Sequence, residues 1–298
     1  MNWRWPWRRK KEPKPAWIVR FLRRRGYKLS RRAEWALGWL ETIVVAGGAA
    51  WLIISFITVR MTVPTGSMIP TIMPGDSFFV DRVSYYFRKP DVGDVIVFWH
   101  VEEIRITGVK PGSPAQEAGV VEGDYLLELG GEPVPSTVTL KRRIEAAAGG
   151  ELALALGREG VGRVELTVSV PADADSLSDL GITARIRRAR YVKRLIAVGG
   201  QEVWIGDGGR IYVDGQPLQV EPIASHTYWS HDPRMRYGIQ PTPVPEGHYF
   251  VLGDNTMNSF DSRYWGFVPV EDFIGEPFFR VWPFSRFGPM NGYLWSSR

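Results

Sequence analysis

The sequence predicts a mainly β protein that carries an inserted α+β domain and begins with a single apolar helix. Short β-branched and aromatic runs, separated by Gly, Asp and Pro turns, recur on both sides of the middle of the chain. Between Trp99 and Tyr191 the composition changes to Gly, Ala, Glu and Leu, with few aromatic residues. Ahead of both parts, the run Thr42–Val59 has no charged side chain.

These changes in composition divide the 298 residues into four predicted parts. The boundaries that we expect are a basic segment at 1–38, an apolar helix at 39–59, a β domain made of 60–102 and 189–298, and an inserted domain at 103–188.

The first part is strongly basic. Thirteen Lys and Arg residues stand between Met1 and Glu34, against two acidic residues. Because such a flank stays in the cytoplasm, we expect a cytoplasmic N-terminus and a main domain on the outer face of the membrane. The basic residues and nearby tryptophans are also expected to bind anionic membrane lipid. Nucleic-acid binding is the competing interpretation of a net charge of +5, and charge concentrated beside an apolar run disfavours it.

The second part, residues 39–59, is predicted to cross a membrane once as a helix. At about 1.5 Å per residue, the run Thr42–Val59 is roughly long enough to span a hydrocarbon core. The eight residues from Val59 to Ser67 reach at most about 26 Å, so Ser67 is expected close to the bilayer. A cleavable signal peptide is disfavoured because the basic region is far too long.

Short apolar runs predict the strands of the β domain. They are Phe78–Val80, Val95–Trp99, Tyr191–Val198, Val203–Ile205, Ile211–Val213 and Tyr249–Leu252. In the inserted part, one helix is predicted after an N-cap at Ser136 or Thr137. Its apolar face includes Leu140 and Ile144, and it ends at Gly149-Gly150.

Three separate segments indicate one chemistry. Ser67 lies in Thr65–Thr71, where Gly66 and Pro70 favour a tight, exposed turn. Lys193 lies inside an apolar strand, where burial lowers the pKa of an amine and allows it to act as a base. Taken singly, Ser67 is a turn serine and Lys193 an edge-strand lysine. Neither interpretation explains the third segment, the dense polar loop 253–266 between hydrophobic strands.

Together these segments resemble the conserved boxes of bacterial type I signal (leader) peptidases. Thr65–Thr71 resembles the nucleophile box, Gly93–Phe98 the strand that follows it, Tyr191–Arg194 the lysine box and Gly253–Gly266 the C-terminal box. The resemblance implies a signal-peptidase-type β catalytic domain in the bacterial inner (cytoplasmic) membrane. It also implies that the enzyme is a serine endopeptidase that acts on preproteins with signal peptides and uses no cofactor or metal.

The same resemblance implies a role for each matched residue. Ser67 is expected to attack the scissile carbonyl, and Lys193 to act as the general base. Other expected roles are the oxyanion hole (Thr65 hydroxyl and Ser67 N–H), lysine orientation (Ser259), a supporting ion pair (Asp261 and Arg263) and pockets for small substrate residues (Val63 and Val192). The chain departs from the family pattern at Thr65, where serine is usual, but threonine keeps the hydroxyl.

The inserted part has a resemblance of its own. Val109–Val120, followed by Glu122–Leu127, is similar to the core of a PDZ domain. The apolar-Gly-apolar loop that opens a PDZ peptide groove occurs only at the far end, so the domain is predicted to be circularly permuted. Its groove is expected between Ile182–Ile186 and the helix Thr137–Ala148, and to bind a peptide or a protein C-terminus as an added strand. The groove residues that we predict are Leu180, Gly181, Ile182 and Leu140. A rigid spacer with an empty groove is the alternative.

Other functions are disfavoured. The chain has no cysteine, which excludes disulfides and thiol catalysis. The spacing of His226 and His231 is unlike that of a zinc pair. A self-cleaving repressor-type protease conflicts with the predicted span, and a heat-shock PDZ protease needs a nucleophile loop that is missing here. The remaining alternative is a membrane-tethered PDZ adaptor with an inactive peptidase domain, which intact Ser67, Lys193 and Ser259 disfavour.

Overall fold

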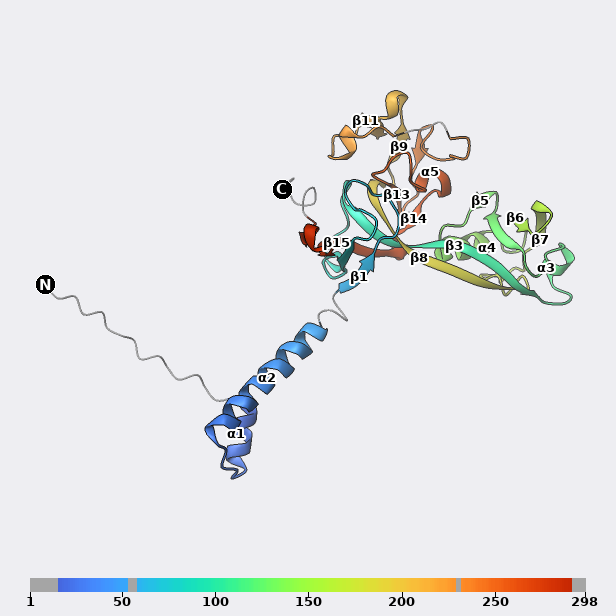
Figure 1. The fold of residues 1–298 in the computed structure, drawn as a ribbon. Helices are drawn as coiled ribbons and strands as arrows, with labels where there is room; N and C mark the ends of the chain where they lie inside the picture. Colours follow the sequence, from blue (N-terminus) through green and yellow to red (C-terminus); the bar gives the residue numbers. More distant parts are fainter. Residues whose placement is uncertain (1–15, 53–57, 229–231, 291–298) are drawn as a thin grey trace. The chain divides into compact units, whose positions relative to one another are not determined.

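A computed structural model describes residues 16–52, 58–228 and 232–290 (Figure 1). The chain separates into two compact units, Met1–Thr58 and Val59–Arg298. The described part of the smaller unit is helical. The larger one is mainly β, as predicted.

In the smaller unit, helix α1 (Trp17–Arg24) and helix α2 (Arg31–Leu52) pair with each other. The Glu41 carboxylate of α2 accepts the free backbone N–H groups of Trp17 (2.9 Å) and Ile18 (2.8 Å), and so caps the start of α1. Among the described residues, no helix combines the length and the apolar character that crossing a membrane requires. Of the predicted span 39–59, residues 53–57 lie outside the described part, and Thr58 already begins a strand.

The larger unit contains every strand that the sequence predicted. Its strands are β1 (Thr58–Thr62), β2 (Ser77–Asp81), β3 (Val95–Val109), β4 (Tyr125–Leu129), β5 (Glu132–Pro133), β6 (Glu151–Arg158), β7 (Gly162–Ser169), β8 (Ile182–Val198), β9 (Glu202–Ile205), β10 (Ile211–Val213), β11 (Gln216–Pro217), β12 (Thr242–Pro243), β13 (His248–Leu252), β14 (Val268–Pro269), β15 (Phe273–Trp282) and β16 (Gly288–Pro289). The helices are α3 (Pro114–Glu117), α4 (Thr137–Ala146) and α5 (Ser262–Trp265), and the 3₁₀ turns are η2 (Ser84–Tyr86), η3 (Asp207–Gly209), η4 (Ile223–Ser225), η5 (Val270–Asp272) and η6 (Phe284–Arg286).

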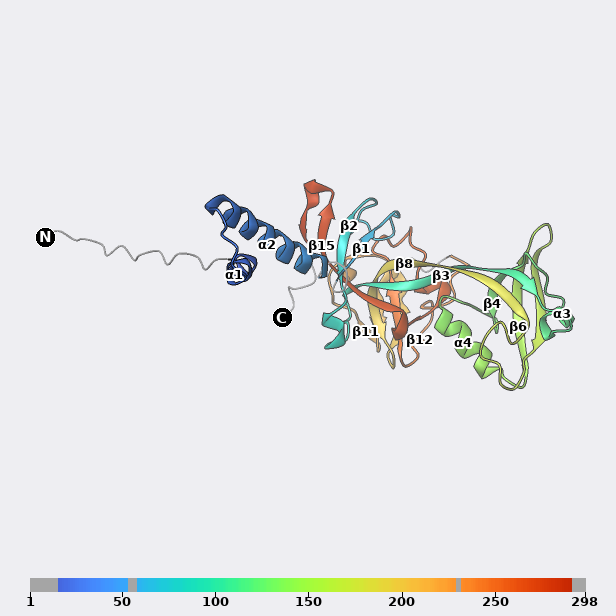
Figure 2. The same cartoon turned by 90° about the horizontal axis from the view of Figure 1, so that it is seen from below.

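Two long antiparallel strands, β3 and β8, connect the main β part (59–102 and 189–290) to the inserted part (103–188) (Figures 1 and 2). Their pairing runs from Val95 opposite Arg194 to Val109 opposite Ile182. The register shifts between Val101 and Glu103, where the sequence placed the start of the inserted domain. The inserted part is therefore continuous with the main sheet through two paired strands, and no loose linker separates them.

The residues between these strands have a hydrophobic cluster of their own. It includes Leu140 and Ile144 of α4, together with side chains of β4, β6 and β7. Ser136 is the N-cap, because its hydroxyl accepts the Val138 N–H at 3.0 Å, and positive φ at Gly149 follows the end of the helix. One separate cluster lies beneath the turn that contains Ser67, and another lies around the short sheet β11-β10-β9-β12.

Candidate active site

Ser67 lies in a turn after β1 that is fixed from below and from the side. Met68 and Ile72 are fully buried in the cluster beneath the turn. On its other side, the Asn255 backbone N–H donates to the Ser67 carbonyl (3.0 Å), and the Asn255 side chain donates to the Gly66 carbonyl (2.9 Å). These contacts join the nucleophile box to the C-terminal box and hold the serine in one position.

Lys193 reaches the same point from β8. Its Nζ lies 2.9 Å from Ser67 Oγ and 3.1 Å from the Val192 carbonyl oxygen, and the residue is only 4% exposed. Burial lowers the pKa of Lys193 to about 8, while the nearby carboxylates of Asp261 and Asp254 act in the opposite direction. The amine is then mostly neutral above about pH 8, more than two pH units below the point at which an ordinary lysine loses its proton, as a general base requires.

A cavity of about 480 Å³ opens at this pair. Val63 and Val192, the predicted pocket residues, lie in its wall and are 3% and 4% exposed. Thr65, whose hydroxyl is predicted for an oxyanion hole, lines the same cavity. Its remaining lining residues include Tyr191, Arg190, Glu102, Arg234, Ser259 and Tyr264.

The predicted supporting residues lie against this cavity from the C-terminal box. Asp261 and Arg263 form a fully buried ion pair (2.8 Å), and Asp261 also accepts the Gly253 N–H at 3.1 Å. Ser259 is buried in the cavity wall, yet its hydroxyl finds no hydrogen-bond partner among the residues that the structure describes. The hydrogen bond to Lys193 that the sequence predicted is therefore not formed in this structure, in which Lys193 Nζ contacts Ser67 and Val192 instead.

A second buried ion pair was missed by sequence reasoning. Arg194 follows Lys193 on β8, and its guanidinium binds both carboxylate oxygens of Asp254 (2.7 and 2.6 Å) and the Gly93 carbonyl (2.6 Å). Thr71, at the end of the nucleophile box, also bonds Asp254. The pair thus ties the lysine strand to both boxes. An arginine inside an apolar strand, next to the lysine already singled out, was the signal for it.

The predicted PDZ groove residues lie away from this cavity. Leu140, Leu180 and Ile182 are 6%, 0% and 3% exposed and pack together in the cluster of the inserted part. Gly181 has φ +84°, and a Cβ there would lie 2.2 Å from Ser113 Cβ, so position 181 faces the start of α3. The predicted groove residues are therefore core residues in this structure.

Of His226 and His231, only His226 lies within the described residues. Its Nδ1 contacts the Pro222 carbonyl.

Comparison with known proteins shows where the chain has relatives. The sequence profile of the family described as "Signal peptidase, peptidase S26" matches residues 36–147 and 164–282. A probable signal peptidase I-1 from Synechocystis sp. is 29% identical over 254 residues, which cover 85% of this chain and 86% of the relative. A signal peptidase I from Leptolyngbya laminosa is 26% identical over 251 residues (84% and 82%), and a probable signal peptidase I from Mycobacterium leprae is 27% identical over 284 residues (87% and 79%).

A crystal structure of a signal peptidase I from Enterococcus faecalis V583 is 33% identical to the matched part. The match covers 29% of this chain and 81% of the Enterococcus faecalis chain. Its TM-score of 0.23 is too low for a comparison of folds.

Proposed function

Because the chain belongs to the signal peptidase S26 family and is a serine endopeptidase of the signal peptidase I type, we propose that Ser67 and Lys193 are its catalytic dyad. The observation that carries this proposal is the 2.9 Å approach of a buried amine with a depressed pKa to the Ser67 hydroxyl. The substrates would be exported preproteins, cleaved after the signal peptide.

In this mechanism, neutral Lys193 accepts the Ser67 proton while Ser67 Oγ attacks the scissile carbonyl carbon. The oxyanion of the tetrahedral intermediate accepts hydrogen bonds from the Ser67 backbone N–H and the Thr65 hydroxyl. Protonated Lys193 then donates its proton to the leaving amine, and an acyl-enzyme remains on Ser67. Lys193 then takes a proton from a water whose oxygen attacks the ester carbonyl, and it returns this proton to Ser67 Oγ when the ester C–O bond breaks and the carboxylic acid product leaves.

The surrounding residues would support the dyad without reacting. The Asp261–Arg263 pair fixes the loop that carries Ser259, whose hydroxyl would orient the lysine amine. Val63 and Val192 leave room for alanine-sized side chains, so cleavage should follow a small residue that has another small residue two positions earlier. Equal cleavage of substrates with Leu or Phe at these positions would contradict the pocket assignment.

The test uses purified full-length enzyme and a preprotein substrate. Ser67→Ala and Lys193→Met should each abolish cleavage while the protein stays folded. Lys141→Met is the matched control, since Lys141 binds Asp175 on the surface of the inserted part, and this variant should keep full activity. Substantial turnover by purified Ser67→Ala or Lys193→Met would reject the dyad.

We also propose that residues 39–59 anchor the enzyme in the membrane, with the basic segment in the cytoplasm and in contact with anionic lipid. The charge pattern of the first 34 residues supports this orientation. Extraction of the membrane fraction with carbonate should leave the full chain in the pellet. Release of most of the chain would contradict anchoring.

The inserted part is proposed to be a PDZ domain that binds an extended peptide along β8, and its support is the sequence resemblance. Because Leu140, Leu180 and Ile182 are buried in one hydrophobic cluster, ligand binding would require this cluster to open. Peptides with an apolar C-terminus should then protect the amides of residues 182–188 from hydrogen exchange. Unchanged exchange across a peptide library would favour the spacer interpretation.

A further inference from the structure

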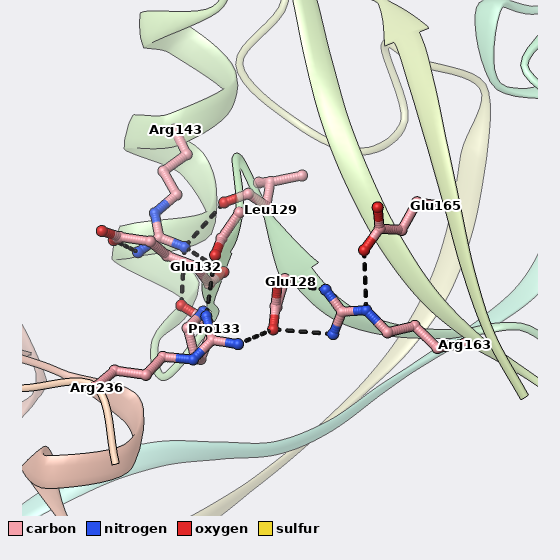
Figure 3. Close-up of polar contacts among 9 residues, drawn as sticks. Glu128, Leu129, Glu132, Pro133, Arg143, Arg163, Glu165 and Arg236 are labelled. Atoms are coloured by element: carbon pink, nitrogen blue, oxygen red, sulfur yellow. Dashed lines mark hydrogen bonds and ion pairs between the residues drawn. The ribbon is translucent and has the colours of Figure 1, made fainter. Parts of the chain in front are cut away.

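One arginine of the main β part extends into the inserted part (Figure 3). Arg236 donates through Nη2 to the Glu128 carboxylate and through Nη1 to the Gly131 carbonyl at 3.0 Å. Glu128 is only 6% exposed, and it also receives two hydrogen bonds from Arg163 (3.0 and 2.7 Å). Hydrogen bonds from Arg163, and to a lesser degree from Arg236, hold the pKa of the Glu128 carboxyl below its usual range, although burial opposes this.

The backbone of Arg236 is attached to the C-terminal box. Its N–H, and that of Tyr237, donate to the Arg263 carbonyl at 2.8 and 3.1 Å. Arg263 is the partner of Asp261, the buried pair next to the dyad. The segment that contains Arg236 is thus held on one side by the main β part and on the other by Glu128.

Two residues earlier, the same segment forms a wall of the catalytic cavity. Arg234 lines the cavity that contains Ser67 and Lys193. Its guanidinium binds Asp232 at 2.6 Å and lies over the Tyr264 ring, 5.8 Å from the centroid. The Arg234 side chain is 81% exposed, so these local contacts alone hold it weakly, and its position depends on the backbone on either side.

The inserted part does not need Arg236 to stay attached. The Ser136 hydroxyl bonds the buried Asp272 carboxylate, Arg142 binds Glu271 at 2.5 Å, and β3 and β8 are continuous through both parts. The Glu128–Arg236 pair therefore adds little to attachment, and its distinctive effect is on the segment that carries Arg234.

We propose that Arg236 is a positioning residue through which the inserted part shapes the substrate cavity. By binding Glu128, Arg236 holds residues 232–237 so that Arg234 contacts the polypeptide chain of a preprotein, through its carbonyl or carboxylate oxygens, next to the scissile bond. The proposal rests on the assignment of the Ser67 cavity as the substrate site.

Such a contact is made in the bound substrate and in the transition state alike, so its loss should raise KM and leave kcat nearly unchanged. Arg236→Met should raise KM for a preprotein by about ten-fold. Arg163→Met is the matched control, because it removes the other arginine from the same carboxylate without touching the 232–237 segment, and its KM should stay within about two-fold of the wild type.

Arg234→Met should reproduce the increase in KM. The double variant Arg234→Met/Arg236→Met should be no worse than either single variant, since both changes remove one contact. Additive effects, or an Arg236→Met enzyme with the kinetics of Arg163→Met, would overturn the proposal. So would a fall in kcat at constant KM, which is the result expected if Arg236→Met only reduced the folded fraction.

Binding of an uncleaved preprotein to Ser67→Ala gives a readout that does not depend on turnover. Adding Arg236→Met should weaken this binding by the same factor as it raises KM, and unchanged binding would reject the role of Arg236. If Ser67→Ala cleaves the preprotein, the dyad assignment fails instead, so the two failures are distinguishable.

Discussion

At the scale of single residues, the proposed dyad depends on the desolvation of Lys193. Lys193 is surrounded by apolar strand residues, and only partial compensation comes from Asp254 and Asp261. The sequence was sufficient to select Ser67 and Lys193 as candidates, because a charged residue in an apolar strand is visible as a break in pattern, and the two side chains lie 2.9 Å apart. The Arg194–Asp254 pair breaks the pattern too. However, no spacing rule shows that two residues 60 positions apart meet, so Asp254 could not be predicted as the partner of Arg194.

The depressed pKa of Lys193 sets the pH dependence of turnover. Activity should rise with pH through an apparent pKa of about 8, because only the neutral amine accepts the serine proton. A pH–rate profile for kcat/KM on a short peptide measures this value. A profile that rises only near the ordinary lysine pKa of about 10.4 would show that the amine is not desolvated.

The same pKa predicts a stability difference. Below about pH 8, Lys193 is protonated in both the folded and the unfolded chain, and the folded state bears the cost of the buried charge. Lys193→Met should therefore unfold at higher urea concentration than the wild type at pH 7. This advantage should shrink as pH rises from about 8 to about 10.4, where the unfolded lysine also loses its proton. A pH-independent difference would contradict the assignment.

The buried Arg194–Asp254 pair should be far more sensitive than a surface pair. Asp254→Asn leaves the Arg194 guanidinium buried without a counter-charge, and should cost about 3 kcal/mol of unfolding free energy. Asp175→Asn, which disrupts the surface pair with Lys141, is the control and should change stability little. Urea unfolding of both variants measures the two free energies of unfolding. Similar losses would mean that the buried pair stabilises the fold no more than the surface pair does.

At the scale of elements, the strands of the β domain could be predicted from short apolar runs, and the helix Thr137–Ala146 of the inserted part from its caps. What the sequence did not show is that β3 and β8 continue beyond the predicted runs, since Glu102, Glu103 and a series of arginines interrupt the apolar pattern. Most of these residues are exposed on a two-strand ribbon, where polar side chains stay in contact with water. Gly181, which the sequence placed in a peptide groove, has a backbone conformation that favours glycine, but it faces Ser113.

The contact of Gly181 with Ser113 can be tested directly. Gly181→Ala should destabilise the inserted part, because the new Cβ overlaps Ser113 and the backbone has φ +84°. Ser113→Gly in the same chain should recover part of the lost stability, because it removes the overlap but leaves the backbone strain. Thermal unfolding of the single and double variants separates the two contributions. No rescue by Ser113→Gly would show that strain alone matters.

At the scale of the whole molecule, the inserted part enters and leaves through neighbouring strands. His100 lies opposite Ala189 on the β3–β8 ladder, and Val101 is already part of the inserted hydrophobic cluster. Replacing residues 101–188 with Asn-Gly should therefore close the ladder as an ordinary hairpin. The shortened enzyme should stay folded and cleave a short peptide with kcat within about three-fold of the full chain.

For preproteins, the shortened enzyme should show the raised KM expected of Arg236→Met. Circular dichroism and kinetics on both substrates check this prediction. Loss of short-peptide cleavage in a folded protein would mean that the inserted part has a direct role in the chemistry.

The adjacency of the two crossing points has an evolutionary consequence. A β-hairpin tolerates growth at its tip, because the strands hold the ends of the loop together whatever its length. The 101–188 segment extends from such a pair of strands and has a hydrophobic cluster of its own. Any domain whose termini lie side by side meets the same geometric condition. The tip of β3 and β8 is therefore a graft point, at which a secretion enzyme can acquire a new recognition domain in one genetic step without redesign of its catalytic centre.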